Sequence, residues 1–130
     1  MSDLQCPATI LLIPRECLAS GSHVCALAGR RLAGFFVDAT VAAEPAAFAA
    51  ISGAAQVSQC PIEVARPVDD SARLAELLDG LADLYRGETV AVVVTAAVIQ
   101  ARLRFSEAPS EPVAIAIDSD GWILAPPPAG

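Results

Sequence analysis

Four residues with chemically useful side chains follow two apolar runs of the chain, Ala8 to Ile13 and Thr89 to Val94. These residues are Arg15, Glu16, Cys17 and Thr95. An arginine binds a carboxylate or a phosphate through two parallel N–H bonds, and a cysteine beside a cation ionises more readily to a nucleophilic thiolate. If the two runs are neighbours in space, these residues form a candidate pocket for a small anionic ligand.

Each of these side chains also has a structural interpretation, and the sequence leaves the alternatives open. Cys17 is interpreted as a buried structural thiol, and Thr95 as the cap of a helix that begins at Ala96. Arg15 is interpreted as one half of a surface salt bridge. Its candidate partners are Glu16, Glu44 and Asp70.

The two runs are typical of strands covered on both faces. Thr89 to Val94 is continuously apolar and β-branched, which is typical of a central strand in a parallel sheet, and Ala8 to Ile13 is similar. Thr95-Ala96-Ala97 then turns the chain into helical spacing. Because open α/β sheets bind ligands at the carboxyl ends of their strands, the residues after both runs are the candidate site.

The remaining pattern completes an α/β domain. Helices are expected at Val24 to Phe36, at Glu44 to Ala55, and from the capping sequence Asp69-Asp70-Ser71 to Arg86. Further strands are expected at Val37 to Val41, Pro61 to Val64, Val113 to Ile117 and Trp122 to Leu124, the last two as a hairpin. We predict one domain over residues 1–125 with a mainly parallel sheet, followed by a proline-rich tail at residues 126–130.

Composition narrows the classes of partner. The chain carries a net charge of −7 and has no lysine, which argues against nucleic acid and against an anionic membrane surface. No stretch approaches the ~20 apolar residues of a membrane-spanning helix, and the first residues have no basic region of the secretory type. A cytoplasmic location is therefore expected.

The cysteines and the one histidine predict neither a metal nor another cofactor. The four cysteines form no Cys-x-x-Cys pair, and Cys17, His23 and Cys25 match no standard zinc spacing. In a cytoplasmic chain the cysteines are expected to be reduced thiols. His23 is expected to be an exposed or capping residue of a loop.

Several strings resemble the histidine phosphatase, or phosphoglycerate mutase-like, superfamily. Gly87 to Leu103 resembles its strand, "SHGG" turn and following helix, and Ala28 to Ala33 resembles its "LGRRQA" helix. Asp38 to Ala43 resembles its "DAVYSS" strand, while Ile10 to Ile13 precedes the position of its "RHGE" motif. The resemblance implies a three-layer α/β/α fold of the short phosphohistidine-phosphatase size.

The catalytic positions of that family hold different residues here. The resemblance places Pro14 at the phosphate-binding arginine and Arg15 at the nucleophilic histidine of "RHGE". It places Thr95 at the second histidine and Ala47 at a further arginine, with Asp70 near the position of the proton donor. An arginine stays protonated and cannot replace a nucleophilic imidazole.

The sequence therefore favours a catalytically inactive phosphatase-like scaffold that binds a protein partner or a small anionic ligand. The alternative is an enzyme that reuses the former phosphate pocket for other chemistry on a small anionic substrate. In either case the candidate pocket residues are Arg15, Glu16, Cys17, Thr95 and Asp70. The sequence leaves homodimerisation open.

Overall fold

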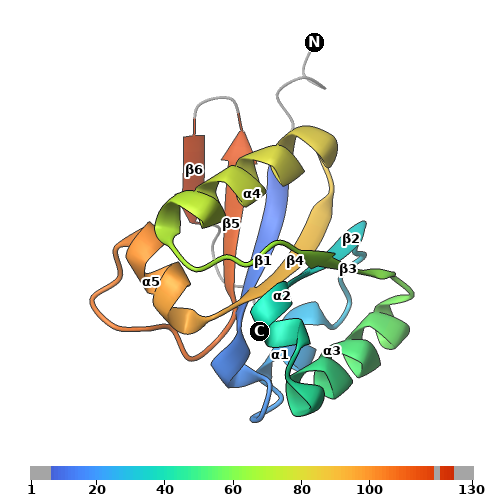
Figure 1. Cartoon of the computed structure of the whole chain (residues 1–130). Helices are drawn as coiled ribbons and strands as arrows, with labels where there is room; N and C mark the ends of the chain where they lie inside the picture. The colour runs from blue at the N-terminus through green and yellow to red at the C-terminus, as the bar shows by residue number, and fades with distance from the viewer. Residues whose placement is uncertain (1–6, 119–120, 125–130) are drawn as a thin grey trace.

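The protein folds around one mixed sheet of six strands (Figure 1). The computed structural model describes residues 7–118 and 121–124, with only the backbone described for Ser22, Cys25 and Asp118. The strands are β1 (Ala8–Pro14), β2 (Gly34–Asp38), β3 (Ile62–Ala65), β4 (Thr89–Val94), β5 (Val113–Asp118) and β6 (Gly121–Leu124). Their order across the sheet is β3-β2-β4-β1-β5-β6.

The two apolar runs are adjacent central strands, as predicted. β1 and β4 pair in parallel, with Ile10 opposite Val90 and Pro14 opposite Val94. β2 joins the other side of β4 in parallel, and β3 joins β2 in parallel at the edge. The predicted hairpin is β5 and β6, which pair antiparallel beside β1. The sheet is thus mainly parallel.

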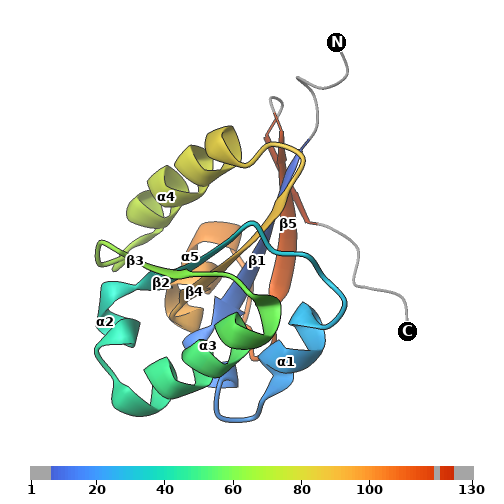
Figure 2. The same ribbon diagram turned by 90° about the vertical axis from the view of Figure 1, so that its right-hand side faces the viewer.

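Helices cover both faces of this sheet, which gives three layers (Figure 2). The helices are α1 (Ser22–Leu27), α2 (Ala39–Ala42), α3 (Pro45–Ser58), α4 (Ser71–Leu84) and α5 (Ala96–Leu103), and Arg15–Cys17 forms a 3-10 turn. Residues of α4 and α5 pack on one face, and residues of α1, α2 and α3 pack on the other. The predicted α/β/α architecture is therefore confirmed.

Alternate residues of the central strands belong to different halves of the core. Ile10 and Leu12 pack with the α4 and α5 side, while Leu11 and Ile13 pack with the α1 to α3 side. All four are essentially without solvent exposure. Burial on both faces explains why these runs are continuously apolar rather than alternating.

The prediction of a helix from Val24 to Phe36 is wrong. The helix α1 ends at Leu27, and Gly29 adopts a φ of +74°, a left-handed conformation that favours glycine. The chain then enters β2, whose five residues are all buried. Aromatic and β-branched residues pack well in such a strand, and this tertiary burial overrides the apparent helical spacing.

The strand expected at Val37 to Val41 is displaced for the same reason. It begins earlier, at Gly34, and ends at Asp38, whose carboxylate accepts a hydrogen bond from the backbone N–H of Thr40 at 3.1 Å. That bond caps α2. The same carboxylate accepts from the N–H of Val68 at 3.2 Å, which ties the end of β2 to the segment before α4.

The other predicted elements lie close to their expected positions. The structure has α3 at Pro45–Ser58, the edge strand β3 at Ile62–Ala65 and α4 at Ser71–Leu84. The first residues and the proline-rich tail, on which two further expectations rest, lie outside the described residues.

Candidate functional site

The carboxyl ends of β1 and β4 lie side by side, so the sheet brings the segments around Arg15 and Thr95 together. Pro14, the last residue of β1, is opposite Val94, the last residue of β4. The 3-10 turn follows β1 directly, and α5 begins immediately after Thr95. We call Arg15, Glu16, Cys17 and Thr95 the strand-end cluster.

Glu16 closes the amino end of α5. Its Oε1 accepts a hydrogen bond from the backbone N–H of Ala96 at 2.9 Å. The first N–H groups of a helix lack partners within the helix and carry partial positive charge, so a carboxylate is stabilising there. Thr95 is the N-cap residue of α5, as predicted, but its side chain makes no capping hydrogen bond.

Arg15 is bound by a carboxylate of the same chain. Its Nε and Nη2 donate to the two carboxylate oxygens of Glu44, the residue before α3. Hydrogen bonding and the charge of Glu44 raise the pKa of Arg15, and hydrogen bonding to Arg15 lowers the pKa of Glu44. The salt-bridge interpretation of Arg15 is therefore confirmed, with Glu44 as the partner.

Cys17 and His23 are both buried. Cys17 is only 1% exposed and packs among the apolar side chains of the α1 to α3 half of the core. Its backbone carbonyl accepts a hydrogen bond from the ring of His23. The buried-thiol interpretation of Cys17 is confirmed. A ligand from solvent would not reach this thiol without displacing its neighbours.

His23 is 4% exposed and lies in α1, so the expectation of an exposed loop residue is wrong. Burial lowers the pKa of its imidazole, and the hydrogen bond to the Cys17 carbonyl partly opposes that shift. Nδ1 is buried and has no hydrogen-bond partner among the described residues. The sequence around His23 did not indicate this burial, because the burial depends on how α1 packs.

Asp70 has a local structural role. Its carboxylate accepts from the backbone N–H of Arg73 at 2.8 Å and caps α4, as its sequence context predicts. Among the described residues, no hydrogen bond or ion pair connects Asp70 with the strand-end cluster. The structure thus joins Arg15, Glu16, Cys17 and Thr95 in one region but gives no bond that adds Asp70 to it.

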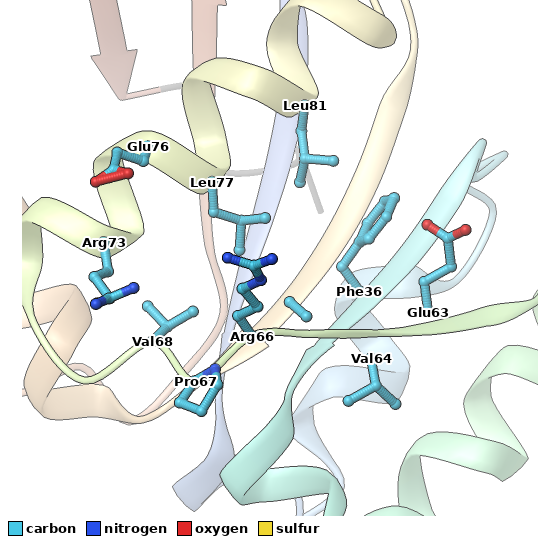
Figure 3. Close-up of a pocket in the computed structure, with 11 residues that line it drawn as sticks. Phe36, Glu63, Val64, Arg66, Pro67, Val68, Arg73, Glu76, Leu77 and Leu81 are labelled. Atoms are coloured by element: carbon cyan, nitrogen blue, oxygen red, sulfur yellow. The ribbon is translucent and has the colours of Figure 1, made fainter.

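A groove of about 710 Å³ lies between the edge strand β3 and the helix α4 (Figure 3). We call it the β3–α4 groove. Its apolar lining includes Phe36, Val68, Leu77 and Leu81. Its charged lining is Glu63, Arg66, Arg73 and Glu76. The groove exists because α4 packs over β1 and β5 and leaves the β2 and β3 side of that face less covered.

Two guanidinium groups in this groove differ from Arg15. Among the described residues, Arg66 makes no hydrogen bond or ion pair, and in Figure 3 its side chain extends toward Leu77. Arg73 has Asp69 at 3.8 Å, with both side chains largely exposed, which makes a weak pair. An anion with an apolar body fits this combination, because an arginine binds carboxylate or phosphate and the lining accepts apolar surface.

The groove was not predicted from the sequence. Arg66 follows the edge strand and precedes Pro67, and the chain has no acidic residue between Glu63 and Asp69. An arginine shortly after the expected edge strand was the available signal. That arginine lines a groove only because α4 leaves part of the sheet uncovered.

Comparisons with known proteins bear on the fold. No family model and no curated protein matches the sequence. Among solved structures, the crystal structure of phosphoglycerate mutase from Plasmodium falciparum is similar, with a TM-score of 0.63 and 13% sequence identity. The match covers 93% of this chain and 90% of that chain. The fold is phosphoglycerate mutase-like.

Two further findings concern residues 7–118 and 121–124. No helix there is long and apolar enough to cross a membrane. Within the same residues, no three histidine, cysteine or acidic side chains lie together in a way that would hold a metal ion.

Proposed function

We propose that this protein is a catalytically inactive, phosphatase-like scaffold that acts by binding. The observation that carries the proposal is the internal bonding of the strand-end cluster. Arg15 is held by Glu44, and Glu16 occupies the amino end of α5. The groups that would have to receive a phosphate there are committed to other parts of the same chain.

The chemistry of the cluster supports the same conclusion. Phosphoryl transfer through a covalent intermediate needs a nucleophile with an available electron pair. It also needs cations that remain available to the phosphate oxygens. Arg15 is a protonated cation, Cys17 is buried, and Glu16 places a negative charge where a phosphate would gain most from the helix end. A carboxylate at that point repels an incoming anion.

An enzyme that reuses the pocket for other chemistry is the alternative. It would need Arg15, Glu16 and Cys17 to exchange their present partners for a substrate. No contact among the described residues favours that exchange, since the guanidinium and both carboxylates already bond within the chain.

We place the binding of a small anionic ligand in the β3–α4 groove. Arg66 supplies a guanidinium without a partner among the described residues, and Phe36 and Leu77 supply apolar surface beside it. A ligand with a carboxylate or phosphate on an aromatic or aliphatic body satisfies both parts. Glu63 and Glu76 disfavour ligands with a second negative charge far from the first.

The test of binding uses 2-naphthoate as the probe and two variants of equal charge. Binding is followed through the backbone amide signals in two-dimensional NMR spectra. We expect shifts at residues 65–68 and along α4, and an affinity about tenfold lower in Arg66→Gln, because a charge-assisted hydrogen bond contributes about 1.5 to 3 kcal/mol. Arg31→Gln, at an exposed arginine outside this groove, should bind like the parent.

The test of inactivity is a phosphomonoester assay with p-nitrophenyl phosphate across neutral and acidic pH. We expect no turnover above buffer. Turnover that disappears in Arg15→Gln or Cys17→Ala would establish the alternative, an enzyme that uses the strand ends. Equal naphthoate binding by Arg66→Gln and the parent would remove the groove from the proposal.

A further inference from the structure

The far edge of the sheet carries a surface that the groove does not explain. Within residues 7–118 and 121–124, β6 is the last strand on that side and pairs with β5 alone, as Figure 1 shows. Between Trp122 and Leu124, its outer side therefore presents backbone N–H and C=O groups that β5 does not use. Beside it lies a hollow of about 580 Å³ between α5 and the hairpin. We call Arg102, Leu103, Arg104, Trp122, Ile123 and Leu124 the α5–β6 surface.

This edge lacks one usual protection against pairing, a charged residue within the strand. Ile123 is 59% exposed and Leu124 is 53% exposed, and the four residues of β6 include no charge. At the opposite edge, β3 also has four residues but contains the charged Glu63, while prolines follow closely after both edge strands in the sequence. Charged residues and prolines are common devices that keep an edge strand from accepting another strand. The difference points to β6 as an edge that is open to a partner.

Two arginines give this surface a charge opposite to that of the chain. Arg102 and Arg104 make no hydrogen bond or ion pair among the described residues, although the whole chain carries −7. No acidic residue is among those that line the hollow. Both arginines lie at the carboxyl end of α5, where the helix dipole favours cations.

Contacts on both sides of Trp122 hold one of these cations in place. The guanidinium carbon of Arg102 lies 4.4 Å from the centre of the Trp122 ring, and the indole N–H donates to Asp79 of α4 at 2.9 Å. The Nε of Arg102 is buried and has no hydrogen-bond partner in the part of the chain that the structure describes. The cation is thus oriented before any partner arrives, which lowers the ordering cost of an ionic contact.

We propose that the α5–β6 surface docks an acidic protein segment, which adds an extended strand to the free edge of β6. Backbone bonds to β6 supply affinity, the apolar side chains on one face of the segment cover Ile123, and the carboxylates on its other face bind Arg102 and Arg104 on the side of Trp122. A second copy of this chain fits less well, because a symmetric pairing through β6 would bring the arginines of both copies to the same interface. This surface is independent of the β3–α4 groove.

The probe is a six-residue peptide of alternating valine and glutamate with blocked ends. Two control peptides separate its features: one replaces every glutamate with lysine, and one replaces the two central residues with proline, which removes backbone donors. We expect the acidic peptide to shift the amide signals of residues 121–124 and to slow their hydrogen exchange. The lysine and proline peptides should bind at least fivefold more weakly.

Protein variants complete the test. Arg104→Gln should weaken the acidic peptide at least threefold, while Arg31→Gln, which removes the same charge elsewhere, should not. Thermal unfolding of Arg104→Gln checks that the helix end is intact. Equal binding of the acidic and lysine peptides, shifts outside the α5–β6 surface, or absence of binding at millimolar peptide would overturn the proposal. Dimerisation that Ile123→Lys abolishes would assign the edge to a second copy instead.

Discussion

Two arginines of this protein, Arg15 and Arg66, lie in regions that differ in how their charges are used. Arg15 follows a central strand and donates to both oxygens of Glu44. Arg66 follows an edge strand and makes no hydrogen bond or ion pair among the described residues. In the first region the chain satisfies its own polar groups, and in the second it leaves a cation beside apolar surface. Whether an arginine can bind an anionic ligand therefore depends on whether the chain already pairs its charge. Its position at a strand end does not decide this.

The largest expected effect concerns the cap that closes the strand-end cluster. Glu16→Ala should lower the free energy of unfolding by about 1 to 2 kcal/mol, because α5 loses the acceptor and the charge at its amino end. Glu16→Gln should recover part of the loss. Urea unfolding at neutral pH measures both, with the exposed Glu111→Ala as the matched control. A loss equal to that control would mean that Glu16 does not close the site.

The next effect concerns restoration of a phosphate site. A variant with Pro14→Arg, Arg15→His, Ala47→Arg and Thr95→His places imidazoles and guanidinium groups at the positions that the family resemblance indicates. Because Glu16 occupies the amino end of α5, we expect this variant to bind vanadate poorly. Adding Glu16→Ala should tighten binding about fivefold, as the helix end becomes free for the anion. Equal vanadate affinities in two folded proteins would contradict the proposed role of Glu16.

A smaller effect concerns the buried imidazole behind the cluster. Burial lowers the pKa of His23 in the folded protein below its ordinary value of 6.5. The unfolded chain therefore binds more protons as pH falls below 6.5, and the free energy of unfolding should decrease until pH falls below the lowered folded pKa. In His23→Gln this part of the pH dependence should be absent. An unchanged pH profile would mean that His23 is not buried as described.

The smallest effect concerns the partly exposed pair of Arg15 and Glu44. Arg15 lowers the pKa of Glu44 in the folded protein, so the stabilisation is complete above the ordinary carboxyl value of 4.5 and is lost as pH falls through the lowered one. Arg15→Gln should have a lower free energy of unfolding than the parent at neutral pH, and this difference should shrink in acid. High salt should reduce the difference. A difference that persists in acid and salt would show that another contact, not the ion pair, is responsible.

The fold was largely predictable because its central strands are buried on both faces. That burial requires unbroken apolar runs at Ala8–Pro14 and Thr89–Val94, and such runs are visible in the sequence. The cap Asp70 and the hairpin were equally local signals. The region from Leu27 to Asp38 was misassigned because Phe35 and Phe36 fit a helical spacing as well as a strand. Their segment is a strand because it lies between β3 and β4 in the sheet.

The site was less predictable because its decisive contacts join distant parts of the chain. Arg15 and Glu44 are 29 residues apart, and Glu16 and Ala96 are 80 residues apart. Sequence reasoning placed the strand ends together but could not assign one partner to Arg15 among three acids. It also had no means to find the β3–α4 groove. That groove depends on which strands α4 covers.

An NMR titration with phenyl phosphate tests the central claim most directly, because this one ligand could enter either region. We expect amide shifts at residues 65–68 and along α4, no shifts at Arg15, Glu16 or Ala96, and no release of inorganic phosphate. Saturable shifts at Arg15 and Ala96, with or without hydrolysis, would contradict the account. They would show that the strand ends still accept a phosphate despite Glu16 and Glu44.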